Sequence, residues 1–325
     1  MMQKEIGMKI EPATIKRLIN DHYFSSLEIR LKRIPLGEDS YNFLVSIGNQ
    51  KFVLKWYKEI DQESIREELL AMKWLNTHGV LVPDVLHTQE GGLFVEVGKT
   101  FAVLFEYIEG DALDDTFSSA IKIARFLAEF HVKSTQYTGR FCPGRSEISR
   151  LKAFKSVCET TQGYLSVEGI QPFINDFSRE MEIFETARVQ IGDELNEGII
   201  HHDLHRENFL KNAKTGQIKA ILDFSEAHQG YLVFDLAVLL GYWAIDRDKA
   251  NLDMEKCRQL LSAYNDNKPI TKAHMRLLPH AVLLYFATDA TGYILPRLRH
   301  TQSFTIAQCN MYEWFKALRQ NRSWI

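Results

Sequence analysis

Three polar side chains between residues 199 and 227 have the types and spacing that metal–nucleotide chemistry requires. Asn208 follows Asp203 after four intervening residues, and Asp223 comes later, in the run Ile-Leu-Asp-Phe. Phosphoryl transfer needs one carboxylate to accept the proton of the attacking hydroxyl, and it needs an amide oxygen and a second carboxylate to hold metal ions. This stretch therefore predicts phosphoryl transfer from a magnesium–nucleotide complex.

The segments around these side chains predict a hairpin that brings the metal ligands together. Asp203 follows an apolar strand end at Ile199 and Ile200, and the return strand Ile218–Leu222 leads directly to Asp223. An Asp-x-x-x-x-Asn pattern alone has little specificity, so the interpretation depends on what the rest of the chain supplies.

Lys55 and Glu68 are the candidates for a phosphate-binding pair. Lys55 lies in the predicted strand Lys51–Tyr57, and Glu68 lies beside the apolar stripe of the predicted helix Asp61–Asn76. A lysine that reaches the α- and β-phosphates of a nucleotide needs a carboxylate from a neighbouring helix to hold it. The alternatives are a lysine on the solvent face of a strand and a solvated helix glutamate.

The two strands before this lysine predict a β-hairpin with a glycine-containing loop. They span Leu31–Ile34 and Phe43–Ile47, and the loop between them carries Gly37 and Ser40. This order is typical of a hairpin that covers nucleotide phosphates, although an ordinary hairpin gives the same pattern. Gly37 and Ser40 are therefore candidates for nucleotide binding.

A hinge between two lobes is predicted at about residues 106–110. The apolar strand Phe101–Tyr107 runs there into a Gly-Asp turn. We expect the backbone groups of Glu106, Tyr107 and Ile108 to hydrogen-bond an adenine edge, because a hinge strand lacks a sheet neighbour on one side.

Periodicity predicts an α+β fold of two lobes. The N-terminal nucleotide-binding lobe, residues 1–108, has an antiparallel β-sheet and one key helix, and the C-terminal catalytic and substrate-binding lobe, residues 111–325, is mainly helical. The helices predicted for the second lobe are Ser119–Lys133, Arg150–Thr161, Ile174–Arg188, Phe234–Ile245, Met254–Tyr264, Thr271–Thr288 and Ile306–Gln320.

Composition limits the partners and the compartment. A net charge of −3 gives no electrostatic footprint for nucleic acid or an anionic membrane, and no apolar run reads as a membrane span. The four cysteines are scattered without a C-x-x-C pair, which favours reduced thiols over a disulfide framework or a zinc site. We expect a cytoplasmic protein, a monomer or homodimer, that binds neither nucleic acid nor membranes.

The sequence resembles the aminoglycoside phosphotransferase/choline kinase superfamily over nearly its whole length. Residues 201–208, His-His-Asp-Leu-His-Arg-Glu-Asn, are similar to that family's H-G-D-L-H-x-x-N catalytic loop, and residues 222–224 are similar to its I-D-F metal motif. Residues 127–131 and 231–237 are most similar to type II homoserine kinases and their hydroxylysine-kinase-like relatives. The resemblance implies a bilobal protein-kinase-like fold.

The resemblance also implies a role for each candidate residue. Asp203 would be the catalytic base, Asn208 and Asp223 would bind Mg²⁺, and Lys55 with Glu68 would position the phosphates of ATP.

Three further residues of this region bear on the resemblance. Asp235 resembles the family's buried aspartate that braces the catalytic loop from the following helix. His202 stands where a small Gly or Ala is usual, and His205 fits the aminoglycoside type of loop better than the homoserine type. Both histidines bear on the choice of substrate and leave the phosphoryl-transfer residues unchanged.

The predicted function is an ATP-dependent phosphotransferase that acts on a hydroxyl of a small molecule, first of all an amino acid or amino alcohol, as in homoserine kinases. The alternatives are an aminoglycoside or sugar phosphotransferase and a nucleotide-binding pseudokinase or scaffold. A scaffold would not need the intact set of Lys55, Asp203, Asn208 and Asp223, and no acidic run marks an antibiotic pocket. Candidates for contact with the acceptor are Glu226, His228, Trp243, Asp246, Tyr285, Asp289, Tyr293, Arg297 and Arg299.

Overall fold

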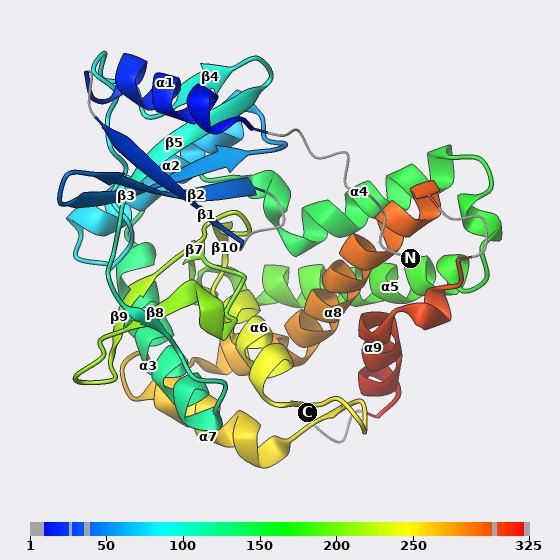
Figure 1. The fold of residues 1–325 in the computed structure, drawn as a ribbon. Helices are drawn as coiled ribbons and strands as arrows, with labels where there is room; N and C mark the ends of the chain where they lie inside the picture. Colours follow the sequence, from blue (N-terminus) through cyan, green and yellow to red (C-terminus); the bar gives the residue numbers. More distant parts are fainter. Residues whose placement is uncertain (1–9, 26–27, 36–39, 301–303, 322–325) are drawn as a thin grey trace. The chain divides into compact units, whose positions relative to one another are not determined.

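The computed structural model describes residues 10–25, 28–35, 40–300 and 304–321 (Figure 1). The chain divides into two compact units, Met1–Glu109 and Gly110–Ile325. We call them the N-terminal unit and the C-terminal unit.

An antiparallel sheet in the order β1-β2-β3-β5-β4 forms the centre of the N-terminal unit. The tight turn between its second and third strands contains Gly48, whose φ of 56° lies in the left-handed region that glycine adopts without strain. The strands are β1 (Ile29–Ile34), β2 (Ser40–Ile47), β3 (Gln50–Tyr57), β4 (Val95–Val97) and β5 (Thr100–Glu106).

Two helices accompany this sheet. In α1 (Pro12–His22), Ile15 and Ile19 are fully buried in one apolar cluster with sheet residues such as Leu54. In α2 (Gln62–Thr77), the Asp61 side chain accepts a hydrogen bond from the Ser64 N–H and caps the first turn. The apolar stripe of α2 is buried, so the helix holds a fixed face toward the rest of its unit.

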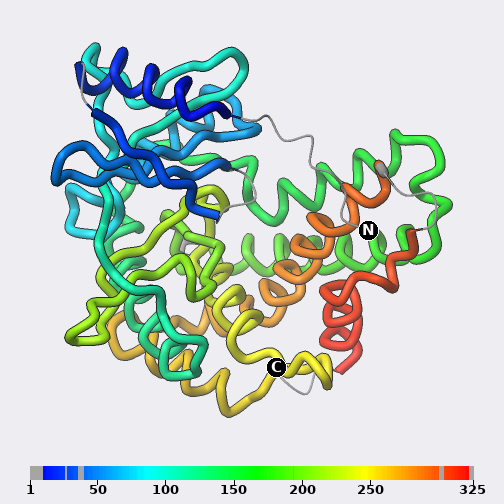
Figure 2. Tube along the Cα trace, in the orientation of Figure 1, coloured from blue at the N-terminus to red at the C-terminus, as the bar shows by residue number. Residues whose placement is uncertain are grey.

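The C-terminal unit is mainly helical. Its α6 is buried on nearly every side, and α8 packs against α4, α5, α6 and α9. Figure 2 shows the orange trace of α8 running beside the green traces of α4 and α5. The helices are α3 (Phe117–Ser134), α4 (Glu147–Thr160), α5 (Ile170–Ile191), α6 (Val233–Trp243), α7 (Met254–Asn265), α8 (Lys272–His300) and α9 (Asn310–Gln320).

Short strands hold the loops of the C-terminal unit. The central loop, which contains Asp203, joins β7 to β8. The pairing of β7 with β10 and of β8 with both β6 and β9 fixes the two ends of that loop. The bounds are β6 (Asp111–Ala112), β7 (Glu197–Ile200), β8 (Phe209–Lys211), β9 (Ile218–Ile221), β10 (His228–Tyr231), β11 (Ile245–Asp246) and β12 (Asn251–Leu252).

The predicted α+β architecture is confirmed, with an antiparallel sheet in the N-terminal unit and helices in the C-terminal unit. Three predicted helices differ clearly in extent, and one of them, expected at residues 174–188, spans Ile170–Ile191. The helix expected at residues 271–288 continues to His300 through Pro279 and Pro296. The one expected at residues 306–320 is a single 3₁₀ turn, Ile306–Gln308, followed by α9.

Two further expectations concern thiols and membranes. All four cysteines are buried, and within the described residues none of them forms a disulfide. Within residues 10–25, 28–35, 40–300 and 304–321, no helix combines the length and apolar character that crossing a membrane requires.

Candidate active site

A buried carboxylate on α6 fixes the backbone just before Asp203. Asp235 is fully buried, and its two oxygens accept the N–H groups of His201 (2.8 Å) and His202 (2.7 Å). The same carboxylate lies 2.9 Å from Nε2 of His131 on α3. Asp235 therefore braces the loop that contains Asp203 from the following helix, which is the contact expected from the resemblance.

His131 supports Asp235 as a neutral donor. Burial lowers the pKa of His131, so the ring is neutral near pH 7. The ring then donates from Nε2 to Asp235 and accepts from the Tyr264 hydroxyl at Nδ1, 2.8 Å away. Burial acts to raise the pKa of Asp235, but the hydrogen bonds from His131 and the loop N–H groups outweigh it and keep that pKa low.

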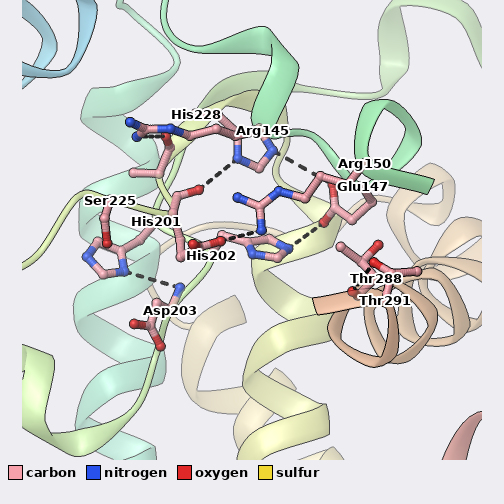
Figure 3. Close-up of polar contacts among 12 residues, drawn as sticks. Arg145, Glu147, Arg150, His201, His202, Asp203, Ser225, His228, Thr288 and Thr291 are labelled. Atoms are coloured by element: carbon pink, nitrogen blue, oxygen red, sulfur yellow. Dashed lines mark hydrogen bonds and ion pairs between the residues drawn. The ribbon is translucent and has the colours of Figure 1, made fainter. Parts of the chain in front are cut away.

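His201 joins the catalytic loop to the strand that precedes Asp223. Its ring is fully buried, and Nε2 lies 2.8 Å from the Leu222 carbonyl oxygen. The other ring nitrogen, Nδ1, accepts the N–H of Asp203 at 3.3 Å, a contact drawn in Figure 3. One imidazole therefore sets both the Asp203 backbone and the end of β9.

Asn208 and Asp223 lie at adjoining strand ends. The Leu222 N–H donates to the Asn208 carbonyl at 2.7 Å, so Asp223 is the next residue along from this contact. Asp223 has a φ of 55°, and its Oδ1 accepts the Ser225 N–H at 3.2 Å. The predicted hairpin therefore forms, and it places the two predicted metal ligands at neighbouring strand ends.

The Asn208 side chain is oriented by Asp203. Its Nδ2 donates to the Asp203 carbonyl oxygen (3.0 Å) and to Asp203 Oδ2 (2.8 Å). Because both contacts use the amide nitrogen, the amide oxygen is the ligand atom that Asn208 offers. One amide oxygen and the Asp223 carboxylate are hard oxygen donors that suit Mg²⁺, which keeps other positions for water and phosphate. The residues present thus fit this ion.

The carboxylate of Asp203 also contacts His205. The distance from His205 Nε2 to Asp203 Oδ2 is 3.2 Å, and both side chains are about one-third exposed, at 30% and 32%. Burial acts to raise the pKa of Asp203, but the hydrogen bond and charge of His205, with His201 and Asn208, lower it below the usual value. The Asp203 hydrogen bond in turn raises the pKa of His205.

Behind the loop, two histidines converge on a buried glutamate, as Figure 3 shows. Glu147 on α4 is fully buried, and its Oε1 lies 2.8 Å from His202 Nε2. Its Oε2 lies 3.7 Å from Nε2 of the fully buried His228. His202, one of the two histidines expected to bear on the choice of substrate, is directed to Glu147.

In the N-terminal unit, Tyr57 contacts both members of the predicted phosphate-binding pair. Lys55 Nζ lies 4.8 Å from the centre of the Tyr57 ring, and the Tyr57 hydroxyl donates to Glu68 Oε1 at 2.7 Å. Glu68 is fully buried and Lys55 is 9% exposed. The tyrosine ends the strand that carries the lysine, and the sequence offered no signal that it would reach the helix.

The remaining nucleotide-binding candidates belong to the predicted glycine-containing loop and to the end of β5. Gly37 lies outside the described residues. Ser40 begins β2, is buried, and its hydroxyl lies 3.4 Å from Asn42 Oδ1. The expectation that the Glu106 backbone would be available is wrong for its N–H, which donates to the Asp84 carbonyl at 2.8 Å.

The other two hinge candidates follow the last strand of the N-terminal sheet. Tyr107 and Ile108 come after the end of β5, and Lys51 Nζ lies 5.3 Å from the centre of the Tyr107 ring.

Several acceptor candidates have partners of their own. Glu226 pairs with Arg150, and Asp246 pairs with Lys249 at 2.9 Å. The Arg297 guanidinium lies 3.3 Å from the centre of the Tyr293 ring and donates to the Tyr293 carbonyl.

Trp243 supports the catalytic loop. Its Nε1 donates to the Leu204 carbonyl at 2.9 Å, so the indole holds the residue that follows Asp203. Trp243 therefore holds the loop at Leu204, in addition to the contacts that Asp235 and His201 make with it.

Comparison of the sequence with known proteins identifies a protein family and relatives within it. A sequence model of the APH family, described as a phosphotransferase enzyme family, matches residues 30–268. A homoserine kinase from Burkholderia ambifaria is 26% identical over 293 residues, which cover 85% of this chain and 84% of that protein.

Two solved structures are similar over almost the whole chain. A microcompartment-associated aminopropanol kinase has a TM-score of 0.64 at 19% identity, covering 94% of this chain and 95% of that one. An amicoumacin kinase in complex with AMP-PNP, Ca²⁺ and its ligand Ami has a TM-score of 0.72 at 15% identity, covering 98% and 96%. The expected protein-kinase-like fold is confirmed by these likenesses.

Proposed function

This chain belongs to the APH phosphotransferase enzyme family and is a small-molecule phosphotransferase, and from that premise we propose that it phosphorylates a hydroxyl group of an amino acid or amino alcohol, with ATP as donor. The observation that carries the proposal is the ionised Asp203, held between His201, His205 and Asn208. A carboxylate fixed in this way orients a substrate hydroxyl and accepts its proton late in the transfer.

Residues on both sides of Asp203 keep it in position. Its N–H is bound to His201, and its carboxylate receives the Asn208 amide. Since most of the catalysis in phosphoryl transfer comes from positioning and electrostatics, a fixed direction for the base is the contribution expected of this loop.

We assign Asn208 and Asp223 to a magnesium ion. The amide oxygen of Asn208 and the carboxylate of Asp223 would be its protein ligands, next to Asp203 in the same hairpin. The ion would supply positive charge against the β- and γ-phosphates. The related amicoumacin kinase was solved with AMP-PNP and Ca²⁺, which is consistent with a divalent cation at such a site in this fold.

We assign the nucleotide to residues of the N-terminal unit. Lys55 would bind the α- and β-phosphates, with Glu68 and Tyr57 holding the lysine. Gly37 and Ser40 would cover the phosphates. The adenine edge would meet the backbone of residues 106–108, where Glu106 can contribute only its carbonyl because its N–H is bound.

Two similar proteins support the proposed class of acceptor. The relative named homoserine kinase supports an amino acid, and the fold neighbour named aminopropanol kinase supports an amino alcohol. Antibiotic and sugar acceptors, and a nucleotide-binding scaffold without turnover, are the competing outcomes. A cytoplasmic location and a monomeric or dimeric state remain predictions from the sequence.

An ATP-consumption screen tests the proposal. The purified chain is assayed with Mg²⁺ and ATP against homoserine, hydroxylysine, choline, ethanolamine, sugars and aminoglycosides. We expect turnover with an amino acid or amino alcohol, and a loss of about 10²–10⁴-fold in turnover for Asp203→Asn. Turnover with an aminoglycoside alone would reject the proposed acceptor. ATP binding without any turnover would favour the scaffold.

A further inference from the structure

A polar cavity of about 530 Å³ lies in the C-terminal unit beside the catalytic loop. Its volume falls within the range of small-molecule sites, roughly 300–1,000 Å³. Its wall combines charges of both signs with aromatic rings. The lining residues are Asp115, Thr116, Phe117, His205, Arg206, Glu207, Tyr242, Trp243, Arg247 and Lys256.

Two cations of this wall have no acid of their own. Arg206 lies 3.9 Å from Glu207, so its charge is partly matched within the loop. Among the residues that the structure describes, neither Arg247 nor Lys256 forms a salt bridge. Arg247 follows β11 and is exposed, and Lys256 lies in the first turns of α7 with its ammonium 5.8 Å from the centre of the Phe117 ring. Unmatched cations on a cavity wall offer a site for an anionic group.

The cavity adjoins the catalytic base through the His205 side chain. His205 lines the cavity and, through Nε2, lies 3.2 Å from Asp203 Oδ2. The ring of Tyr242, which also lines the cavity, has its centre 6.3 Å from that of His205. A small acceptor whose hydroxyl lies at Asp203 therefore has this cavity next to its other end.

The charges of the base and of the cavity wall act on the same phenol. Burial raises the pKa of Tyr242, the Arg247 charge lowers it, and the charges of Asp115 and Asp203 raise it. The charges of Arg247 and Asp203 thus both act on one side chain of the cavity wall.

We propose that this cavity binds the charged end of an amino-acid acceptor, with Arg247 and Lys256 taking its carboxylate and Asp115 facing its ammonium. The inference rests on the proposed function and narrows the acceptor to compounds with a free carboxylate. Arg297, an earlier candidate for the carboxylate, is stacked on Tyr293. Arg247 and Lys256 instead line the cavity that also contains His205, the contact of Asp203.

The test compares acceptors that differ only by the carboxylate. L-Homoserine is paired with 3-aminopropan-1-ol, and 5-hydroxylysine is paired with 1,5-diaminopentan-2-ol. Affinities are measured by isothermal titration on the intact chain, and KM values are measured for each acceptor that is phosphorylated. We expect the wild type to prefer a carboxylate-bearing member, and the Arg247→Gln/Lys256→Gln variant to lose roughly ten- to hundredfold in its affinity.

A matched control separates this site from a general effect of charge. Lys272→Gln removes an exposed cation of the same unit, at the start of α8, and it should leave the preference unchanged. In the cavity variant, affinity for the amino alcohols and KM for ATP should also stay at the wild-type value.

The outcomes distinguish the inference from the function on which it rests. A carboxylate preference that the cavity variant abolishes supports the inference even if no acceptor is phosphorylated, in which case the proposed function fails alone. Equal binding of acids and amino alcohols by the wild type overturns the inference. An effect of the cavity variant on ATP alone also overturns it, and so does a preference that Lys272→Gln abolishes instead.

Discussion

His202 Nε2 lies 2.8 Å from Glu147 Oε1, in a buried contact beside the loop that contains Asp203. His202 precedes Asp203 and has a φ of 64°, a left-handed conformation that costs a residue with a side chain about 1–3 kcal/mol. The Glu147 carboxylate holds the ring, and Asp235 holds the backbone N–H. These two acids therefore keep the loop in the strained conformation that directs Asp203.

Glu147→Gln should lower both the free energy of unfolding and kcat. The substitution leaves a buried imidazole beside a neutral amide, and breaking a buried pair costs about 3–5 kcal/mol. We expect a free energy of unfolding lower by roughly that amount in urea titrations, and a lower kcat with KM for ATP unchanged, because the nucleotide candidates lie in the other unit.

Glu159→Gln is the matched control on the same helix. Glu159 forms an exposed pair with Lys155 at 3.8 Å, so its loss should change the free energy of unfolding by less than about 0.5 kcal/mol. Equal effects of the two substitutions would contradict the role assigned to the buried pair.

The same pair predicts how stability depends on pH. Burial acts to raise the pKa of Glu147, but the His202 and His228 contacts lower it from 4.5 to about 2. Its contribution is present above pH 4.5 and is lost as the pH falls toward 2. Burial acts to lower the pKa of His202, but Glu147 raises it above 6.5, so its contribution is present below pH 6.5 and is lost as the pH rises through the raised pKa.

Both contributions are therefore complete only between about pH 4.5 and 6.5. The free energies of unfolding of the wild type and of Glu147→Gln/His202→Gln, measured from pH 3 to 9, should differ most in that window. A difference that is constant across the range would show that the pair is not ionised in the folded protein.

The elements that carry the candidate residues could be predicted from sequence because their signals are local. The run of bulky residues around Lys55 marks β3, and the apolar stripe beside Glu68 marks α2. The hairpin that returns Asp223 to Asn208 follows from an apolar strand and a turn.

The contacts that orient these residues could not be predicted in the same way. Glu147 lies 55 positions before His202, and nothing in a helix start indicates which distant side chain it will meet. Tyr57 reads as one more bulky strand residue, and its contact with Glu68 depends on how α2 packs. The strands β7 and β10 are too short to show a period, so their pairing also went unpredicted.

Asn208→Ala should raise the magnesium concentration needed for half-maximal rate. The substitution removes the proposed amide ligand and also the hydrogen bond to Asp203, so kcat should fall as well. Asn212→Ala, on the exposed turn after β8, is the control, because its side chain contacts only backbone N–H groups of that turn. An unchanged magnesium dependence in Asn208→Ala would remove Asn208 from the metal site.

His205→Gln should move the acidic limb of the rate profile to higher pH. Asp203 must be ionised to accept the proton of the acceptor hydroxyl, and it stays ionised down to low pH because His205, His201 and Asn208 outweigh the effect of burial on its pKa. Glutamine retains a hydrogen-bond donor without the charge. The pKa of Asp203 should therefore rise in the variant, and activity should be lost at a higher pH than in the wild type.

The measurement is kcat/KM for the acceptor from pH 4 to 9, because this quantity reports the ionisation of the free enzyme. His87→Gln, which changes an exposed histidine of the N-terminal unit, should leave the profile in place. If the acidic limb of His205→Gln stays where it is in the wild type or moves to lower pH, then the His205 charge does not control Asp203. The limb would then belong to another group, and the assignment of Asp203 as the base would lose its main electrostatic support.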